Sequence, residues 1–483
     1  MKYLLLLFIC IPFLLTAQIG YDQQWLLFNM SKIDFRNNSI QVEKIPRGQY
    51  AVNTGTNPVN ICDENGNFIM YSGGCYILNK DYQIMPNGDS INSAYSFRGW
   101  CSTAGDLPIR QSTTILPHPS QPNEYFVVNF DLQSKVGALH LPFNLLYHRV
   151  DMEADNGLGA VVDKYQIALQ DTFSAGGLTA IRHANGTDWW VIAPRWLSNC
   201  YRVIPITKDG FGEPLPPQCL GIEWPNYHNG QYITASPDGK KYARVGGEMG
   251  LHVFDFDATT GLLSNPIRYP NLEGRNNRGI CFSPSSRYIY LTASDKVYQY
   301  DLTIENVNVA YEVVGEIDLT QLEPWKKDLH FAKLAPNGKI YIGGIGNYRF
   351  LSVINRPNCP GISSAFQPHV LEIPFSTSEG LPNLPHFYIP DTDEQCNSVF
   401  VDVSEIEPLN IHIFPNPVSS QLFIEGITKG HYQLFDLQGR LIKRGMINRT
   451  SMKVDVKNML TGVYYIYIAN QQGQYTIEKI WRK

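Results

Sequence analysis

The feature that most constrains this chain is a short pattern that recurs through most of its length. Each copy consists of a strand, a polar turn rich in Asn, Asp and Gly, and a second strand rich in aromatic residues. The clearest copies are ICDENGNFIMYSGG from Ile61, YITASPDGKKYARVGG from Tyr232 and FAKLAPNGKIYIGGIG from Phe331. Asn-Gly and Asp-Gly tolerate the positive φ of tight hairpin turns, so each copy is predicted to be a β-hairpin.

The spacing of the copies predicts how the hairpins assemble. The equivalent turn positions are Gly66, Asn123, Gly186, Gly239, Ser286 and Gly338, which lie 57, 63, 53, 47 and 52 residues apart. A small sheet cannot bury both of its faces alone, and sheets that repeat at about 40–50 residues bury them by stacking radially as propeller blades. The high aromatic, Gly and Pro content also favours short strands over helices.

The expected fold class is therefore all-β, with a propeller over residues 18–390 that most simply has seven blades. Six units lie between residues 48 and about 375. A seventh blade is expected to join strands from both ends, with one or more strands from Trp25–Glu43 and a closing strand from Gly380–Pro390. Six to eight blades, or a sandwich with long loops, are the alternatives.

Several of these stretches also resemble known proteins. SPDGKKY (Ser236–Tyr242), SPSSRYIYLT and APNGKIYIG resemble WD-like and YVTN-type propellers. RHANGTDWWVIAP, LSVINRPNCPG and GLPNLPHFY resemble a family of exported Bacteroidetes propellers, over most of residues 20–390. The resemblance implies an architecture and no assigned activity.

The N-terminus, MKYLLLLFICIPFLLTAQIG, has the pattern of a secretory signal peptide over residues 1–17. Lys2 supplies the positive charge, and the apolar run of about 13 residues is too short to span a membrane. Cleavage is expected between Ala17 and Gln18. Bulky residues before Cys10 argue against lipidation, and no later segment is long and apolar enough to be a transmembrane helix.

Composition narrows the functional classes. The net charge is −5, with acidic and basic residues mixed and no basic stripe, so a nucleic-acid partner is not expected. Eight cysteines remain after the signal peptide, without a CxxC pair. Export permits disulfides, but eight cysteines allow 105 pairings, and some cysteines could be buried thiols.

No catalytic, cofactor-binding or metal-binding residue is predicted, because no established motif is present. The chain lacks HExxH, GxSxG and phosphate-binding glycine motifs. Asp255 and Asp257 open like a calcium loop, but Thr260 and Pro266 occupy the positions that need Gly and Glu, so a turn is the better interpretation. His183 is more simply a structural histidine than a channel residue.

Propellers can host paired carboxylates, for which the candidates are Asp63, Asp188, Glu223 and Glu248. Candidate sugar-stacking side chains are Trp100, Trp189, Trp190 and Trp196.

After Pro390 the pattern changes. Residues 391–410 are acidic, contain no base and read as a linker. Regular alternation resumes at residue 411, and six or seven short strands in about seventy residues describe a small Ig-like β-sandwich. Pro415 and Pro417 are expected to hold the start of this module extended.

The last module carries the most specific resemblance. FPNPV (Phe414–Val418), YQLFDLQGRLI, VDVKNMLTGVYYIYI and the ending EKIWRK resemble, in order across residues 411–483, the type A C-terminal sorting domain of type IX secretion cargo. The resemblance implies recognition by type IX machinery at the outer membrane after Sec export. The motif residues it implies are Phe414, Pro415, Asn416, Pro417, Asp436, Gly439, Arg440, Gly462 and Tyr464.

Together these observations predict a secreted or surface-attached protein whose propeller is a scaffold for a protein or glycan ligand. The alternative is a secreted, glycan-directed hydrolase with carboxylates in the propeller channel.

Overall fold

A computed structural model describes residues 20–27, 31–37, 39–45, 57–102, 106–136, 139–224, 232–246, 249–270, 277–317, 329–344, 349–374, 380–387, 396, 409, 411–437, 441–470 and 475–483. The chain divides into two compact units, residues 1–397 and 398–483. The predicted cleavage site at Ala17 and Gln18 lies outside the described residues.

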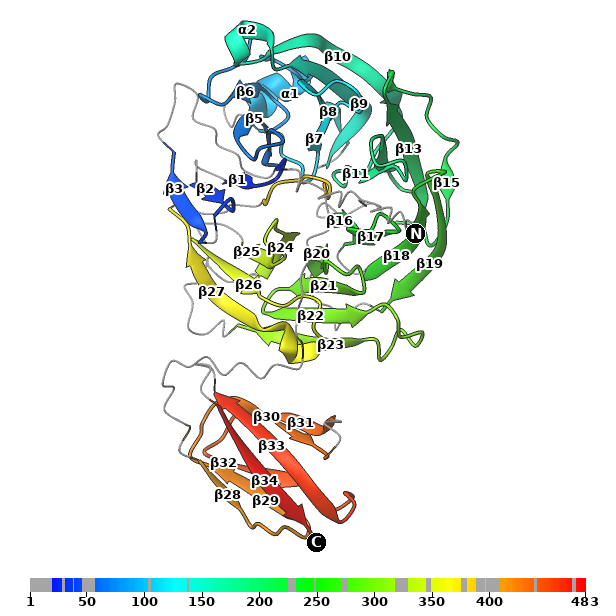
Figure 1. Cartoon of the computed structure of the whole chain (residues 1–483). Coiled ribbons are helices and arrows are strands. Elements are labelled where there is room, and N and C mark those ends of the chain that lie inside the picture. Colours follow the sequence, from blue (N-terminus) through cyan, green and yellow to red (C-terminus); the bar gives the residue numbers. More distant parts are fainter. Residues whose placement is uncertain are drawn as a thin grey trace, which may run out of the picture. The chain divides into compact units, whose positions relative to one another are not determined.

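The first unit consists of a ring of antiparallel sheets, seven of them in its described part (Figure 1). Each sheet is a continuous stretch of chain. The first two are β1 (Gln24–Leu27), β2 (Ser31–Asp34) and β3 (Gln41–Lys44), then β4 (Val59–Cys62), β5 (Phe68–Ser72) and β6 (Ile77–Asn79). The third is β7 (Thr113–Pro117), β8 (Glu124–Val136), β9 (Leu139–Asp151) and β10 (Ala160–Gln170).

The remaining four sheets repeat the arrangement. The fourth comprises β11 (Thr179–Arg182), β12 (Trp189–Pro194), β13 (Cys200–Thr207), β14 (Gly210–Phe211) and β15 (Gln218–Cys219). The fifth comprises β16 (Tyr232–Ala235), β17 (Lys241–Val245), β18 (Leu251–Asp257) and β19 (Leu262–Tyr269). The sixth comprises β20 (Asn277–Phe282), β21 (Tyr288–Ala293), β22 (Lys296–Asp301) and β23 (Tyr311–Glu316), and the seventh β24 (Leu329–Leu334), β25 (Ile340–Gly344), β26 (Phe350–Ile354) and β27 (Phe366–Glu372).

Short helical turns fall between strands. They are α1 (Ala94–Ser96), the π-helical turn η2 (Phe97–Cys101), α2 (Ala154–Gly157) and the 3-10 turn η3 (Gly361–Ser364). The first strand of each sheet is the innermost, and these inner strands are neighbours around the axis: β1 lies beside β4, β4 beside β7, and β16 beside β20. This radial arrangement is a β-propeller, and each sheet is a blade.

The predicted hairpin turns lie between the first and second strand of their blades. Five of the six turn positions have the left-handed backbone that such turns need, with φ of +81° at Gly66, +80° at Gly186, +69° at Gly239, +62° at Ser286 and +76° at Gly338. Two of these turns are also stabilised by a hydrogen bond to a serine side chain. Oγ of Ser236 accepts the N–H of Lys241 (2.8 Å), and Oγ of Ser283 accepts the N–H of Tyr288 (3.1 Å).

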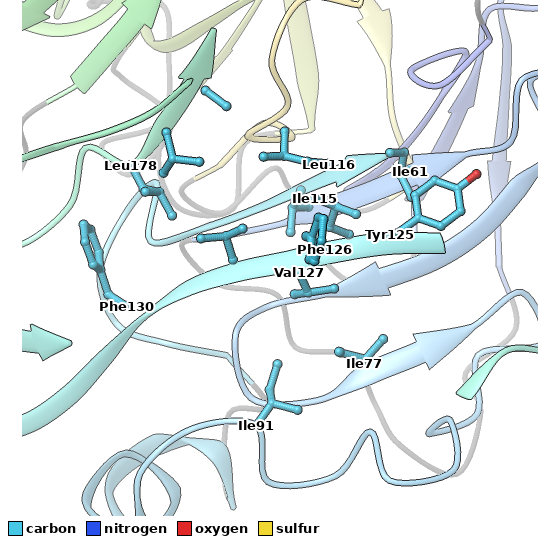
Figure 2. Close-up of a cluster of buried hydrophobic side chains, with 14 of the residues drawn as sticks. Ile61, Ile77, Ile91, Ile115, Leu116, Tyr125, Phe126, Val127, Phe130 and Leu178 are labelled. Carbon is cyan, nitrogen blue, oxygen red and sulfur yellow. The ribbon is translucent and has the colours of Figure 1, made fainter. Parts of the chain in front are cut away.

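The propeller core lies between the blades. Figure 2 shows part of it, where apolar side chains from neighbouring blades meet. Ile61, Ile115, Val127 and Leu178, which come from two blades and a connecting segment, are all fully buried. Burial of such side chains contributes about 1.5 to 3 kcal/mol each, so interdigitating blades stabilise one another.

The second unit is a two-layer β-sandwich. One sheet has the order β28 (His412–Phe414), β29 (Gln421–Glu425) and β32 (Ser451–Asp455). The other has the order β31 (Leu441–Ile447), β30 (Gly430–Phe435), β33 (Gly462–Asn470) and β34 (Tyr475–Arg482). Alternate residues of the strands, including Leu422, Leu434 and Ile466, are fully buried between the sheets, as period-two patterning predicts.

Candidate functional site at the propeller axis

The axis of the propeller contains a segment of its own chain, residues 380–387. Asn383 makes three hydrogen bonds to backbone carbonyls. Its Nδ2 donates to the carbonyls of Thr113 (2.9 Å) and Leu178 (3.0 Å), and its backbone N–H donates to the carbonyl of Pro58 (3.2 Å). Phe387 lies against the rings of Tyr21 and Trp189, with centroids 5.1 and 5.8 Å away. The segment therefore contacts several blades at once.

This arrangement corrects the expected closing strand. Residues 380–387 form no strand, and the first blade is built from β1, β2 and β3 alone in the described part of the chain. Pro382 and Pro385 explain the difference, since proline has no N–H to donate to a ladder. The two prolines were the signal in GLPNLPHF that the prediction overlooked.

A recess of about 60 Å³ lies beside this segment, lined by one element from each of several blades. Among the residues that line it are Arg110, Gln111, Tyr232, Thr234, Lys333, Asn383 and His386. Gln111 is held in place by its amide group, which accepts the N–H of Ile233 and donates to that residue's carbonyl (both 2.9 Å). The recess thus combines fixed hydrogen-bonding groups with two cationic side chains.

Ionisable groups at the axis are strongly affected by burial. Lys333 donates to the carbonyl of Leu384, and burial lowers the pKa of its amine. Burial raises the pKa of the Asp22 carboxyl to about 7, although the positive charge of Lys333 acts in the opposite direction. Burial and the same charge lower the pKa of His386 to about 3, so this imidazole is neutral near pH 7.

The candidate carboxylates do not come together at the axis. Asp63 accepts the N–H groups of Asn65 and Asn67 in the first turn of its blade (2.9 and 2.8 Å), and Asp188 lies in the turn before β12. Glu223 is exposed, and Glu248 lies outside the described residues. None of the described residues that line the recess is an Asp or a Glu.

The two aspartates of the calcium-like stretch make local contacts. Asp257 accepts the N–H of Thr259 (2.9 Å) and the hydroxyl of Thr260 (2.7 Å), as in a local turn, and Asp255 pairs with Lys241 (2.9 Å). In the described part of the chain, no group of three or more His, Cys, Asp and Glu side chains is placed to hold a metal ion.

The tryptophan hypothesis is also corrected. Trp189 and Trp190 are both buried, and their indole N–H groups donate to the carbonyls of Pro117 (3.2 Å) and Ala258 (2.9 Å). Adjacent strand residues point to opposite faces, but both faces of a blade are covered by neighbouring blades, so neither ring is exposed. His183 packs on the Trp190 ring with centroids 5.4 Å apart, whereas Trp100 and Trp196 are half-buried.

The cysteines divide into three disulfides and two buried thiols. The disulfides are Cys75–Cys101, Cys200–Cys219 and Cys359–Cys396. Cys62 and Cys281 are free and buried, and burial raises the pKa of both thiols, that of Cys281 to about 12. Both are therefore protonated near pH 7.

The motif residues of the second unit cluster around its first and last strands. Phe414 ends β28 and stacks on Phe423, with ring centroids 5.6 Å apart. The Phe414–Pro415 and Asn416–Pro417 bonds are both cis. The Asn416 side chain pairs with the backbone of β34, since Nδ2 donates to the Lys479 carbonyl (2.6 Å) and Oδ1 accepts the Trp481 N–H (2.9 Å).

The other motif residues lie apart from this cluster. Gly462 begins β33, and the hydroxyl of the buried Tyr464 donates to the Leu460 carbonyl (2.8 Å). Asp436 directly follows β30, whereas Gly439 and Arg440 lie outside the described residues.

Comparison with known proteins identifies the second unit. Residues 412–482 match the sequence model of the family described as Secretion system C-terminal sorting domain. The unit is a type IX sorting domain, and a protein that carries one is exported to the cell surface or secreted. In the described part of the chain, no helix is long and apolar enough to cross a membrane.

No curated protein sequence matches the chain. Solved structures that are similar to it share few identical residues with it. A candidate 6-phosphogluconolactonase from Bacteroides fragilis is 13% identical, with a TM-score of 0.36, over 72% of this chain and 89% of the other. The extracellular domain of BT4673, a candidate one-component system of B. thetaiotaomicron, is 11% identical, with a TM-score of 0.37, over 96% and 57%.

The propeller domain of Cps50 (Swd1) from Myceliophthora thermophila is 10% identical, with a TM-score of 0.35, over 67% of this chain and 93% of the other. These TM-scores are below 0.5, so the likenesses imply no ligand and no activity. The protein is an exported or surface protein with a propeller and a type IX sorting domain.

Proposed function

We propose that the propeller is a non-enzymatic binding scaffold that presents the axial recess to a protein or glycan ligand outside the cell. The observation that carries the proposal is the lining of the recess, which has amide, hydroxyl and cationic groups but no carboxylate among the described residues. Such groups donate hydrogen bonds to carbonyl, hydroxyl or carboxylate oxygens, which both glycans and protein loops offer.

The chemistry of a hydrolase finds less support. Glycosidases need two carboxyl groups about 5 to 10 Å apart, one of which acts as an acid. The described lining supplies none, so it lacks the pair that this chemistry needs. The hydrogen-bonding groups of the lining favour the binding scaffold over the hydrolase.

Binding can be tested by blocking the recess. Thr234 lines it from β16 with a small, half-buried side chain, so Thr234→Arg would fill the space. A glycan array and a surface-protein capture screen with the full chain should identify a ligand, and Thr234→Arg should weaken its binding about tenfold or more. Thr187→Arg, at an exposed turn, is the matched control. Equal loss in both variants, or no ligand for the wild type, would contradict the proposal.

Delivery is tested separately. A chain without residues 411–483 should remain in the periplasm, because the sorting domain is the part that type IX machinery recognises. The measurement is protease accessibility of the propeller on intact cells. Normal surface exposure of the shortened chain would contradict a sorting role for these residues.

A further inference from the structure

Among the residues that the structure describes, no shared strand closes the seam between the last and first blades of the ring. In the described residues, β1 to β3 form one sheet and β24 to β27 another, without a strand common to both. Aromatic side chains meet across this seam: the Trp25 ring centroid lies 4.9 Å from that of Phe35 and 5.8 Å from that of Tyr341. A propeller without strand exchange needs another tie to keep its first and last blades together.

Residues 380–387 are placed to supply that tie. Through Asn383 they bond to the carbonyls of Pro58, Thr113 and Leu178, which precede or belong to the inner strands of the second, third and fourth blades. The Leu384 carbonyl accepts from Lys333 on β24 of the seventh blade, and the Phe387 ring contacts Tyr21, which precedes β1. One segment thus links blades on both sides of the seam.

The burial and hydrogen bonds of residues 380–387 indicate that this segment stays at the axis in the folded protein. Leu384 and Phe387 are each only 4% exposed. Asn383 uses both its donor group and its acceptor, since its Oδ1 also faces Nε2 of Gln111 at 3.4 Å. If the segment left the axis, the carbonyls of Thr113 and Leu178 would lose this donor at a buried position, and two large apolar side chains would become exposed.

A disulfide holds the chain just beyond this segment. Cys396 is bonded to Cys359, which lies between β26 and β27. Cys359 is itself fixed to the sixth blade, because its carbonyl accepts Nε2 of Gln299 (2.7 Å), and the neighbouring Pro357 carbonyl accepts the hydroxyl of Tyr290 (2.9 Å). The disulfide therefore attaches the chain to the blades again, beyond the segment at the axis.

We propose that residues 380–387 are the axle on which the propeller closes and that the Cys359–Cys396 disulfide retains this axle. The structural unit of the propeller then ends at Cys396 and not at Pro390. The proposal does not depend on whether the axial recess binds a ligand.

Hydrogen exchange of the intact, oxidised chain, followed by mass spectrometry, tests the axle directly. Peptides that cover residues 380–387 should exchange as slowly as those of the inner strands β7 and β11. Exchange as fast as in the exposed turn at residues 184–187 would overturn the proposal without any variant.

Variants test the named contacts. In Asn383→Asp a carboxylate oxygen would replace the donor and face two carbonyls, so residues 380–387 should exchange about tenfold faster or more. Asn308→Asp is the control, since it adds the same charge at an exposed position. If Asn383→Asp fails to fold, Asn383→Ala removes the bonds without adding charge. Unchanged exchange in a folded Asn383 variant would contradict the role of this residue.

The disulfide has its own matched control. Cys359→Ser with Cys396→Ser should speed the exchange of residues 380–387 more than that of the inner strand β7. Cys200→Ser with Cys219→Ser, which opens a bond between β13 and β15, should speed both to the same degree, as a general loss of stability does. The same ratio of the two exchange rates in both double variants would show that the Cys359–Cys396 bond does not retain the axle.

Discussion

The two units of this protein are stabilised in different ways. The propeller contains all three disulfides and seven of the eight tryptophans, whereas residues 411–483 contain no cysteine and only Trp481. Their charges also differ. Residues 411–483 have ten Lys and Arg against four Asp and Glu, whereas residues 1–410 have 29 against 40.

This contrast shows what each unit depends on. A ring of blades depends on contacts between residues far apart in sequence, so its weak point is the seam, where Trp25 and Phe35 of the first blade meet Tyr341 of the last. A small sandwich depends on alternation within neighbouring strands and needs no such tie. The overall net charge of −5 is the sum of a positive charge on the sorting domain and a larger negative charge on the rest of the chain. Perturbations of the seam or the disulfides should therefore affect the propeller alone.

The largest expected effect is at the seam. Trp25 is fully buried between the first and last blades, and Trp25→Ala should destabilise the propeller by about 3 to 5 kcal/mol. Urea unfolding followed by tryptophan fluorescence measures this, because most tryptophans belong to the propeller. Trp481→Ala, which removes a side chain 49% exposed in the sorting domain, should leave that transition unchanged. A similar shift in both variants would contradict separate stabilisation of the two units.

The next effect concerns the covalent ties. The Cys200–Cys219 disulfide closes a loop with a sequence separation of 19, and its removal by Cys200→Ser and Cys219→Ser should cost about 3 kcal/mol in the chain-entropy picture. The urea midpoint of the propeller should fall, and that of the cysteine-free sorting domain should not. If a reductant lowered both midpoints equally in the wild type, the two units would not unfold independently.

Acid should destabilise the propeller through its buried histidines. Nδ1 of the buried His148 accepts the N–H of Tyr165 (3.0 Å), so protonation would break this bond, and burial lowers the pKa of His148 to about 3. The unfolded chain binds this proton below about pH 6.5, so stability falls as the pH drops from there towards 3. Between pH 7 and 4.5 the loss of stability is about 2.5 kcal/mol for His148.

Buried histidines elsewhere in the propeller act in the same direction, with a pKa of about 4 for His252 and about 3 for His386. Denaturation at a series of pH values measures the slope, which His148→Gln should reduce and His412→Gln, at an exposed position of the sorting domain, should not. A slope unaffected by His148→Gln would show that this histidine does not link protons to folding.

Local signals allowed much of the fold to be predicted from the sequence. The hairpin turns followed from Gly66, Gly239 and Gly338, because positive φ is a property of one residue and its neighbours. The sandwich followed from alternation, and its sorting role from FPNPV and the later motifs. The axle, the seam and the disulfide pairs could not be predicted, because they depend on which distant residues the closed ring brings together. Pro382 and Pro385 could have excluded a closing strand, but not shown where the segment would lie.

The smallest predicted effect tests what a motif residue of the sorting domain does. Asn416 was identified from its resemblance to a sorting signal, yet its side chain bonds to the Lys479 carbonyl and the Trp481 N–H like a short strand against β34. The site is exposed, so Asn416→Ala should lower the stability of the sandwich by only about 1 kcal/mol, whereas Asn458→Ala, at another exposed position, should have no effect. Thermal unfolding of the full chain measures the stability, and surface protease accessibility measures delivery. Because Asn416 joins the first strand of the domain to its last, we expect delivery to fall only as far as stability does. Loss of delivery at full stability would instead assign Asn416 to recognition by the secretion machinery.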